Sequence, residues 1–211
     1  MSRPIPLFPL GVVLYPGERL PLHIHEPRYK EMIGYCLERE DPFGVVLQNE
    51  GVMAEVGCTA IIRRVLHRYD DGRMDIQAEG KLRFRILRVS REQSFLTADV
   101  ESLLDTEETI DTHARERVIT QHMKLLELAG RAVRPSLYEE VGLVSYLIAH
   151  NAGLTLEQKQ DVLISSAENE RIAYLVKHLE TFIPRLEQME GLRKKVRSNG
   201  HIRDFPPAAD S

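Results

Sequence analysis

Three neighbouring residues have the chemistry to bind a metal ion or to transfer protons: His23, His25 and Glu26. Residues two apart on a strand project to the same face. A closed zinc site needs four ligands, however, and the run that begins at His25 fails the His-Glu-x-x-His pattern at Tyr29, while Pro27 interrupts the helix which that pattern requires. We therefore expect no metal and no other cofactor, and interpret these residues as packing or hydrogen-bonding groups at a strand-to-helix junction.

Motifs for nucleotide binding and for peptide hydrolysis do not occur in the sequence. The pair Gly80-Lys81 is followed by Leu82, whereas a phosphate-binding loop needs Ser or Thr at that position. No Gly-x-Ser-x-Gly motif occurs. The cysteines Cys36 and Cys58 form no Cys-x-x-Cys pair, so we expect both to be reduced and buried.

Composition indicates a soluble globular protein. Of the 211 residues, 43% are hydrophobic and 28% are charged, and the formal net charge is −4. This balance provides no basic field for nucleic acid or a membrane surface. Because the sequence has no apolar run of ~18 residues, we expect the protein to lie in the cytoplasm.

The first half of the chain has the pattern of β-strands, because short β-branched or aromatic runs alternate with Gly, Pro and Asp. The predicted strands are Val12–Leu14, Leu20–Ile24, Phe43–Gln48, Val56–Val65, Met74–Glu79, Leu82–Val89 and Phe95–Leu103. Asp70-Asp71-Gly72 predicts a tight hairpin turn. One helix interrupts the strands. It begins at Pro27 and has Tyr29, Met32, Ile33, Cys36 and Leu37 on one face, which should cover the sheet as a lid.

After Asp105 the hydrophobic period changes from two to 3.6, which predicts a helical lobe. A first helix begins near Ile110 and ends by Gly130, and a second begins at Ser136 and ends by Asn151. Capping boxes are predicted at Ser136 with Glu139, Thr155 with Gln158, and Ser165 with Glu168. The last helix has a narrow apolar seam of Ile172, Leu175, Leu179, Phe182, Leu186 and Met189. The pattern therefore predicts a β-rich lobe at 1–104, a helical lobe at 105–197 and a flexible tail at 198–211.

Several short motifs occur in a specific order. The amino-terminal segment contains Pro6-Leu7-Phe8-Pro9-Leu10, Pro16-Gly17, Leu20-Pro21-Leu22 and Ile24-His25-Glu26-Pro27-Arg28-Tyr29. Later matches are Phe43-Gly44-Val45, Val56-Gly57-Cys58, Asp71-Gly72-Arg73-Met74, Gly80 and Arg83-Phe84. With these motifs the chain resembles, from residue 5 to about 197, the amino-terminal substrate-binding domain of the Lon protease family. His25 stands where Phe is common in that family.

The resemblance implies an α+β fold: a PUA-like twisted β-lobe of pseudo-barrel type with one lid helix, followed by a helical bundle that ends in a long helix. It also implies a protein that binds unfolded or tagged polypeptides, or a partner protein, without degrading them. The sequence ends where full-length Lon proteases continue into an ATPase, so we expect no enzyme activity.

Candidate polypeptide-binding residues lie in two segments. They are His25, Arg28, Tyr29, Phe182, Leu186 and Met189. We expect the first segment, from Leu22 to Tyr29, to lie at the junction of the lobes near the helices that begin at Ile110 and Leu137, because binding sites favour such junctions. The later half of the last helix either projects, exposing Phe182 and the residues after it to a partner or to a second copy of the chain, or folds back as core.

An RNA-binding module is the alternative, since PUA-like folds include RNA binders. A local basic stripe comprises Lys81, Arg83, Arg85, Arg88 and Arg91. The only aromatic residue within it, Phe84, falls on the opposite face, whereas RNA binding commonly uses exposed rings for stacking. We interpret the stripe as a solvated sheet face, and expect neither nucleic acid nor membrane as a partner.

Overall fold

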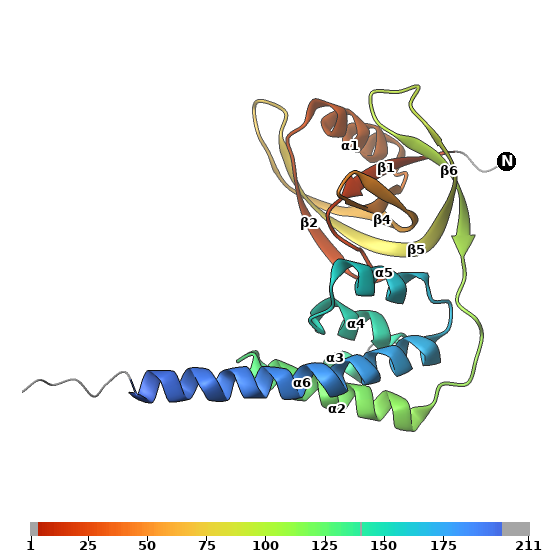
Figure 1. Ribbon diagram of the computed structural model, residues 1–211. Helices are drawn as coiled ribbons and strands as arrows, with labels where there is room; N and C mark the ends of the chain where they lie inside the picture. The colour runs from red at the N-terminus through yellow and green to blue at the C-terminus, as the bar shows by residue number, and fades with distance from the viewer. Residues whose placement is uncertain (1–3, 140, 200–211) are drawn as a thin grey trace, which may run out of the picture.

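The computed structural model describes residues 4–139 and 141–199, and it has an α+β architecture (Figure 1). A twisted sheet with one helix comes first and a group of helices follows, as predicted. We call these two parts the β-lobe and the helical lobe. No helix within the described residues is long and apolar enough to cross a membrane.

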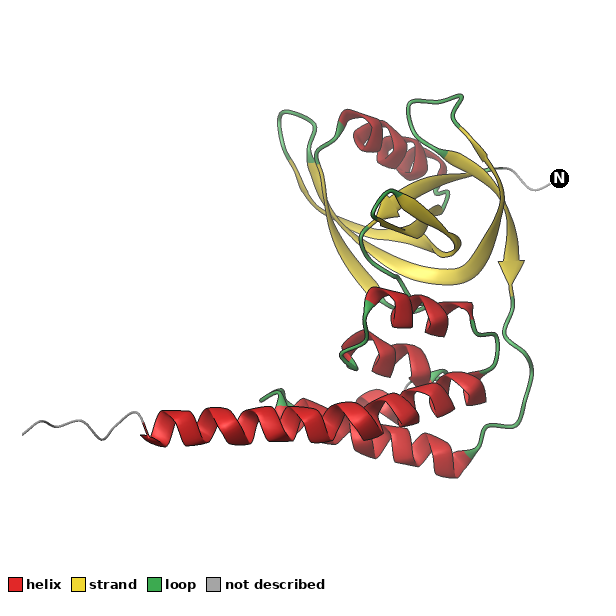
Figure 2. Ribbon diagram, in the orientation of Figure 1, coloured by secondary structure: helices red, strands yellow, loops and turns green. Residues whose placement is uncertain are grey.

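The β-lobe is a sheet that nearly closes into a ring (Figure 2). Its strands are β1 (Ile5–Leu10), β2 (Arg19–Ile24), β3 (Phe43–Asn49), β4 (Val52–Arg68), β5 (Met74–Ser90) and β6 (Thr97–Leu103). Their order is β2-β5-β4-β3-β1-β6, and β6 also pairs with β5. β1 runs parallel to β3, while the other pairs are antiparallel. The predicted hairpin turn at residues 70–72 joins β4 to β5.

One strand prediction is wrong at the start of the chain, and one strand was not predicted. Residues 12–14 form no strand, and the first strand is instead β1, which contains Pro6 and Pro9. Prolines argue against a central strand, because proline has no main-chain N–H to donate to a neighbouring strand. They are tolerated here because β1 pairs with β6 at only two positions, Ile5 and Pro6, and residues 7–10 pair with β3 alone.

β5 is one long strand rather than the two that were predicted, and it contains a bulge that changes which side chains are buried. Ala60 pairs with Gly80, whereas Cys58 pairs with Arg83, so β5 uses three residues where β4 uses two. The extra residue reverses the alternation of side chains along the strand. Leu82, predicted to face inward with Phe84, is therefore exposed, and Arg83 is buried.

Helix α1 (Pro27–Arg39) covers the ring and buries Tyr29, Met32, Ile33 and Cys36, as its sequence pattern predicts. The ring of Tyr29 packs on Phe8, with 4.2 Å between the ring centroids. Cys36 and Cys58 are free thiols inside this core, and burial raises the pKa of each to about 12.

The helical lobe contains α2 (Thr112–Leu128), α3 (Ser136–Glu139), α4 (Val144–Asn151), α5 (Leu156–Ile164) and α6 (Glu168–Asn199). The predicted second helix is thus two helices. The capping box of Thr155 and Gln158 is present. The one predicted at Ser165 is not, because Glu168 turns inward and accepts hydrogen bonds from the main-chain N–H and the hydroxyl of Ser145 at 3.0 and 2.5 Å. α6 extends two residues into the predicted tail, and residues 200–211 lie outside the described residues.

Two buried arginines hold the lobes together. Arg83 of β5 donates to the main-chain oxygens of Leu163 and Ser165, both at 2.9 Å, and to the carboxylate of Asp105. Arg171 of α6 binds the same carboxylate at 2.6 Å. Asp105 lies in the segment that connects the lobes, so both arginines bind the connection itself.

A loop of the β-lobe completes the junction. Its Tyr15 stacks on Tyr146 of α4, with 5.4 Å between ring centroids, and its hydroxyl donates to the main-chain oxygen of Lys159 at 3.0 Å. The prediction that the segment from Leu22 to Tyr29 lies at this junction is wrong. β2 starts beside the helical lobe and runs away from it, so its far end and the start of α1 lie at the opposite side of the ring (Figure 1).

We predict that Tyr29→Ala lowers the free energy of unfolding by about 3 kcal/mol, because it removes a buried ring that packs on Phe8. Urea denaturation measures this change. Leu87→Ala, at an exposed position on β5, serves as the control and should change stability by less than about 0.5 kcal/mol. Equal midpoints for Tyr29→Ala and the parent protein would contradict the role of Tyr29 in the core.

Candidate functional site

The helical lobe has an apolar groove with a volume of about 440 Å³ between α2, α6 and the loop that joins α4 to α5. This volume lies within the range of roughly 300–1,000 Å³ that is typical of ligand pockets. We call it the helical groove. It is lined by Leu125, Leu126, Ala129, Arg131, His150, Asn151, Gly153, Leu154, Lys159, Phe182 and Leu186.

The groove exists because α6 is longer than the helices it packs against. The first residues of its apolar seam are fully buried, among them Leu175 and Leu179. Further along the helix Phe182 and Leu186 are only half-buried, and Met189 is 54% exposed. Figure 1 shows the later part of α6 extending beyond α2 and α4. The seam therefore starts as core, forms one wall of the groove and ends in solvent.

Close packing holds the ring of Phe182 in place. It stacks on His178, with 5.3 Å between ring centroids, and His178 Nε2 lies 3.0 Å from the main-chain oxygen of Ala152. Gly153 approaches the same ring so closely that a Cβ atom there would lie 2.5 Å from Phe182 Cζ. Its φ of +74° is also one that glycine adopts readily. The groove is thus built on a ring that is held from two sides.

Basic residues stand at the rim of the groove. The guanidinium of Arg131 donates to the side-chain oxygen of Asn151 at 2.8 Å. His150 contacts Glu18 of the β-lobe, with 2.5 Å between Nδ1 and Oε1. Lys159 and Arg131 form no ion pair with another described residue. The described residues that line the groove include no carboxylate.

A buried histidine lies on α2, one turn before the groove. His122 Nδ1 is 2.7 Å from the hydroxyl of Tyr138 on α3, while its Nε2 has no hydrogen-bond partner among the described residues. Burial, with a smaller contribution from the positive charge of Arg131, lowers the pKa of His122 to about 4. The imidazole is therefore neutral near pH 7.

The structure does not bring the two predicted binding segments together. Phe182 and Leu186 line the helical groove, and Met189 lies one turn beyond it. Arg28 and Tyr29 instead line a cavity of about 350 Å³ on the β-lobe. There Arg28 binds Glu26 at 2.8 Å and lies over the Tyr29 ring, so these contacts anchor the start of the helix.

The histidines before α1 make local contacts. His23 Nδ1 is 2.6 Å from Asp75 Oδ1, and the ring of His25 stacks on that of His23. Both histidines are exposed. The part of the chain that the structure describes contains no group of three or more His, Cys, Asp or Glu side chains that could hold a metal ion.

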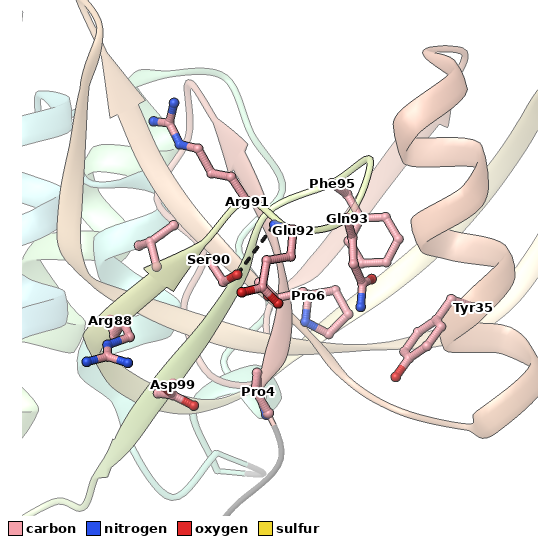
Figure 3. Close-up of a pocket in the computed structure, with 12 residues that line it drawn as sticks. Pro4, Pro6, Tyr35, Arg88, Ser90, Arg91, Glu92, Gln93, Phe95 and Asp99 are labelled. Carbon is pink, nitrogen blue, oxygen red and sulfur yellow. Dashed lines mark hydrogen bonds between the residues drawn. The ribbon is translucent and has the colours of Figure 1, made fainter.

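A larger cavity, of about 830 Å³, lies at another part of the β-lobe (Figure 3). Tyr35 of α1 and Gln93 stand on one side of it, and Arg88 with Asp99 of β6 on the other. The charges that line it are of both signs, since Arg88 and Arg91 are accompanied by Glu92 and Asp99. Its apolar residues, among them Pro6, Val89 and Phe95, are mixed with these charges of both signs, so the lining identifies no single class of ligand.

The predicted basic stripe is wrong at Arg83. This side chain is only 2% exposed, and its guanidinium binds Asp105 at the junction of the lobes. The bulge in β5 is the physical reason. Three of the other members lie beside carboxylates: Lys81 pairs with Glu79, and Arg85 and Arg88 lie opposite Glu101 and Asp99 of β6. The stripe is therefore interrupted and partly neutralised, and no observation here favours RNA binding.

Of the eleven residues that line the helical groove, the sequence identified only Phe182 and Leu186 as binding candidates. Leu125, Leu126, Arg131 and Lys159, for example, were not considered for binding. No spacing in the sequence connects these residues to Phe182, because the groove forms only where α2, α6 and the loop between α4 and α5 meet.

Comparison with known proteins is consistent with this architecture. The family model described as "ATP-dependent protease La (LON) substrate-binding domain" matches residues 4–181. Lon protease 1 of Hydrogenovibrio crunogenus is 24% identical over 88% of this chain and 24% of its own length. Lon protease of Escherichia coli is 28% identical over 92% of this chain and 26% of its own length. The chain thus spans about a quarter of the length of these curated relatives.

Two solved structures share the fold. The Lon N-terminal domain protein from Xanthomonas campestris aligns with a TM-score of 0.68 and 25% identity, over 83% of this chain and 98% of the other. The N-terminal domain of Mycobacterium avium complex Lon protease aligns with a TM-score of 0.60 and 17% identity, over 85% and 100%. The latter likeness concerns the fold alone.

We predict that Arg83→Ala lowers the free energy of unfolding by roughly 3 kcal/mol, because it leaves Asp105 with one arginine fewer and several main-chain oxygens without a donor. Arg85→Ala removes the same charge from an exposed position two residues away and should change stability by less than about 0.5 kcal/mol. Chemical denaturation compares the two variants. Equal effects would show that Arg83 is not a structural residue.

We also predict that the protein loses stability as the pH falls from about 6.5 towards 4. The pKa of His122 is about 4 when folded and about 6.5 when unfolded, so the unfolded state binds more protons in this interval. The contribution of His122 to the free energy of unfolding is therefore fully present above pH 6.5, where it amounts to about 3 kcal/mol.

Unfolding measured against pH tests this prediction. His122→Gln should weaken the dependence of the free energy of unfolding on pH between pH 4 and 6.5. His113→Gln, at an exposed position on the same helix, should not. An unchanged slope in His122→Gln would contradict the assignment.

Proposed function

Because the chain belongs to the family of Lon substrate-binding domains, we propose that it binds polypeptides and that the helical groove is the binding site. The single observation that carries this proposal is the apolar wall of the groove, where Leu126, Phe182 and Leu186 remain half-buried. Apolar side chains that stay partly in water gain free energy when another apolar group covers them.

The proposed site is a place of contact rather than of chemistry. An unfolded polypeptide exposes apolar side chains, and a groove of this size accepts a short segment of them. The polar groups at the rim can bind the main chain of such a segment. In this proposal the 211 residues hold a polypeptide and perform no catalytic step, and the cytoplasm remains the predicted compartment.

Helix geometry favours the groove over the exposed end of α6 as the main binding site. Leu186 faces a concave wall made by α2 and the loop before α5, whereas Met189 has solvent around it. A concave apolar surface buries more of a bound side chain than the convex surface of one helix. Substitutions of these two residues, which lie one turn apart, therefore distinguish binding in the groove from binding to an apolar stripe along α6.

We predict that Leu126→Asp weakens binding of an unfolded polypeptide at least tenfold, because a carboxylate in the groove loses hydration when an apolar segment enters. Fluorescence anisotropy with a dye-labelled, uncharged apolar peptide measures the dissociation constant. Leu186→Glu should act in the same way from the opposite wall.

Two controls make the test specific. Met189→Glu and Leu192→Asp add charge to exposed positions of α6 outside the groove and should leave binding within about twofold of the parent. Thermal midpoints of all variants show whether each one is folded. If Met189→Glu weakens binding as strongly as Leu186→Glu, the binding surface is the apolar stripe of α6 and not the groove.

A further inference from the structure

The charges around the helical groove indicate which peptide charge would be favourable there. Arg131 is exposed beyond the end of α2, and Lys159 lies half-buried on α5, at another part of the rim. Neither is neutralised by a carboxylate among the described residues. The apolar floor is therefore flanked by two unpaired cations.

The remaining charged and titratable groups do not cancel this field. His150 is the third basic residue of the rim, and its partner Glu18 lies on the β-lobe. The carboxyl ends of α2 and α4 also border the groove, and each contributes roughly half a negative charge. The partial charge of α2 is reduced by the hydrogen bonds that Ala129, Gly130 and Arg131 donate to main-chain oxygens of that helix. Two full cations remain the dominant fixed charges.

We propose that the helical groove selects apolar segments that are flanked by acidic side chains over those that are flanked by basic ones. This inference rests on the proposed function and names its substrate class. The apolar side chains of such a segment occupy the groove, and its Asp or Glu residues lie at the rim beside Arg131 and Lys159. A basic flank would place like charges together, which disfavours that partner.

Rim charges of this kind act mainly on selectivity and on the rate of association. Each exposed ion pair contributes little affinity. At an ionic strength of about 0.1 M, the attraction between exposed charges is screened with a decay length of about 10 Å. The preference is therefore expected to be strong at low salt and weak at high salt. Binding of the apolar part is not expected to weaken with salt, because apolar burial does not depend on charge.

Three dye-labelled peptides test the inference with the full chain. They share one apolar centre and carry Glu, Gln or Lys flanks, and both ends are blocked so that only side chains are charged. At low salt the Glu-flanked peptide should bind about tenfold more tightly than the Lys-flanked one. The double variant Arg131→Glu with Lys159→Glu should reverse this order. In about 0.5 M salt the three peptides should bind alike.

A matched control separates local charge from net charge. The double variant Arg68→Glu with Lys177→Glu changes the net charge by the same amount at exposed positions that do not line the groove. It should keep the preference for the Glu-flanked peptide. If it reverses the preference as well, the selectivity comes from the overall field and the inference about the rim is wrong.

Failure of the inference and failure of the proposed function give different results. If all three peptides bind equally at low salt and Leu126→Asp abolishes binding, the groove binds polypeptide but the charge preference is overturned. If none binds, the proposed function fails too. If sedimentation shows a dimer that Leu126→Asp dissociates, and peptides do not compete with it, a second copy of the chain occupies the groove and the inference is overturned.

Discussion

Asp105 accepts hydrogen bonds from two buried arginines that come from opposite parts of the fold, Arg83 of β5 and Arg171 of α6. Arg171 is fully buried and also binds Glu168, whose carboxylate holds the start of α4 through Ser145. Removing one partner of a buried ion pair costs several kcal/mol, because the other charge stays buried without compensation. This network therefore sets the path of the connecting segment and the position of α4 and α6 at once.

The helical groove follows from that arrangement. Arg171 fixes the beginning of α6. The residues of its apolar seam are fully buried against the other helices as far as Leu179, and the later ones are more exposed. Phe182 and Leu186 lie where the packing ends, so each is only half-buried. The same helix is thus core at one end and open at the other, and the transition between the two is the site that we propose for polypeptide binding.

The junction also supplies part of the surroundings of the groove. Tyr15 and Glu18 belong to a loop of the β-lobe, and they contact the main chain of Lys159 and the side chain of His150. The β-lobe therefore influences a site that the helical lobe builds, which gives a physical reason for the two lobes to occur together. The loop thus contacts two of the residues that line the groove, His150 and Lys159.

Local patterns in the sequence determined that a β-rich part precedes a helical part. They also determined the lid helix that begins at Pro27, the buried face of that helix and the capping box at Thr155, because each depends on residues that are close together in the chain. The run of motifs from Pro6 to Tyr29 was sufficient to indicate the family. Only the tertiary structure decided that Arg83 is buried, since a one-residue bulge reverses side-chain alternation without any mark in the sequence. It also separated Arg28 and Tyr29 from Phe182 and placed Phe182 beside Leu126, Arg131 and Lys159. The groove depends on packing between α2, α6 and the loop between α4 and α5, which are far apart in the sequence.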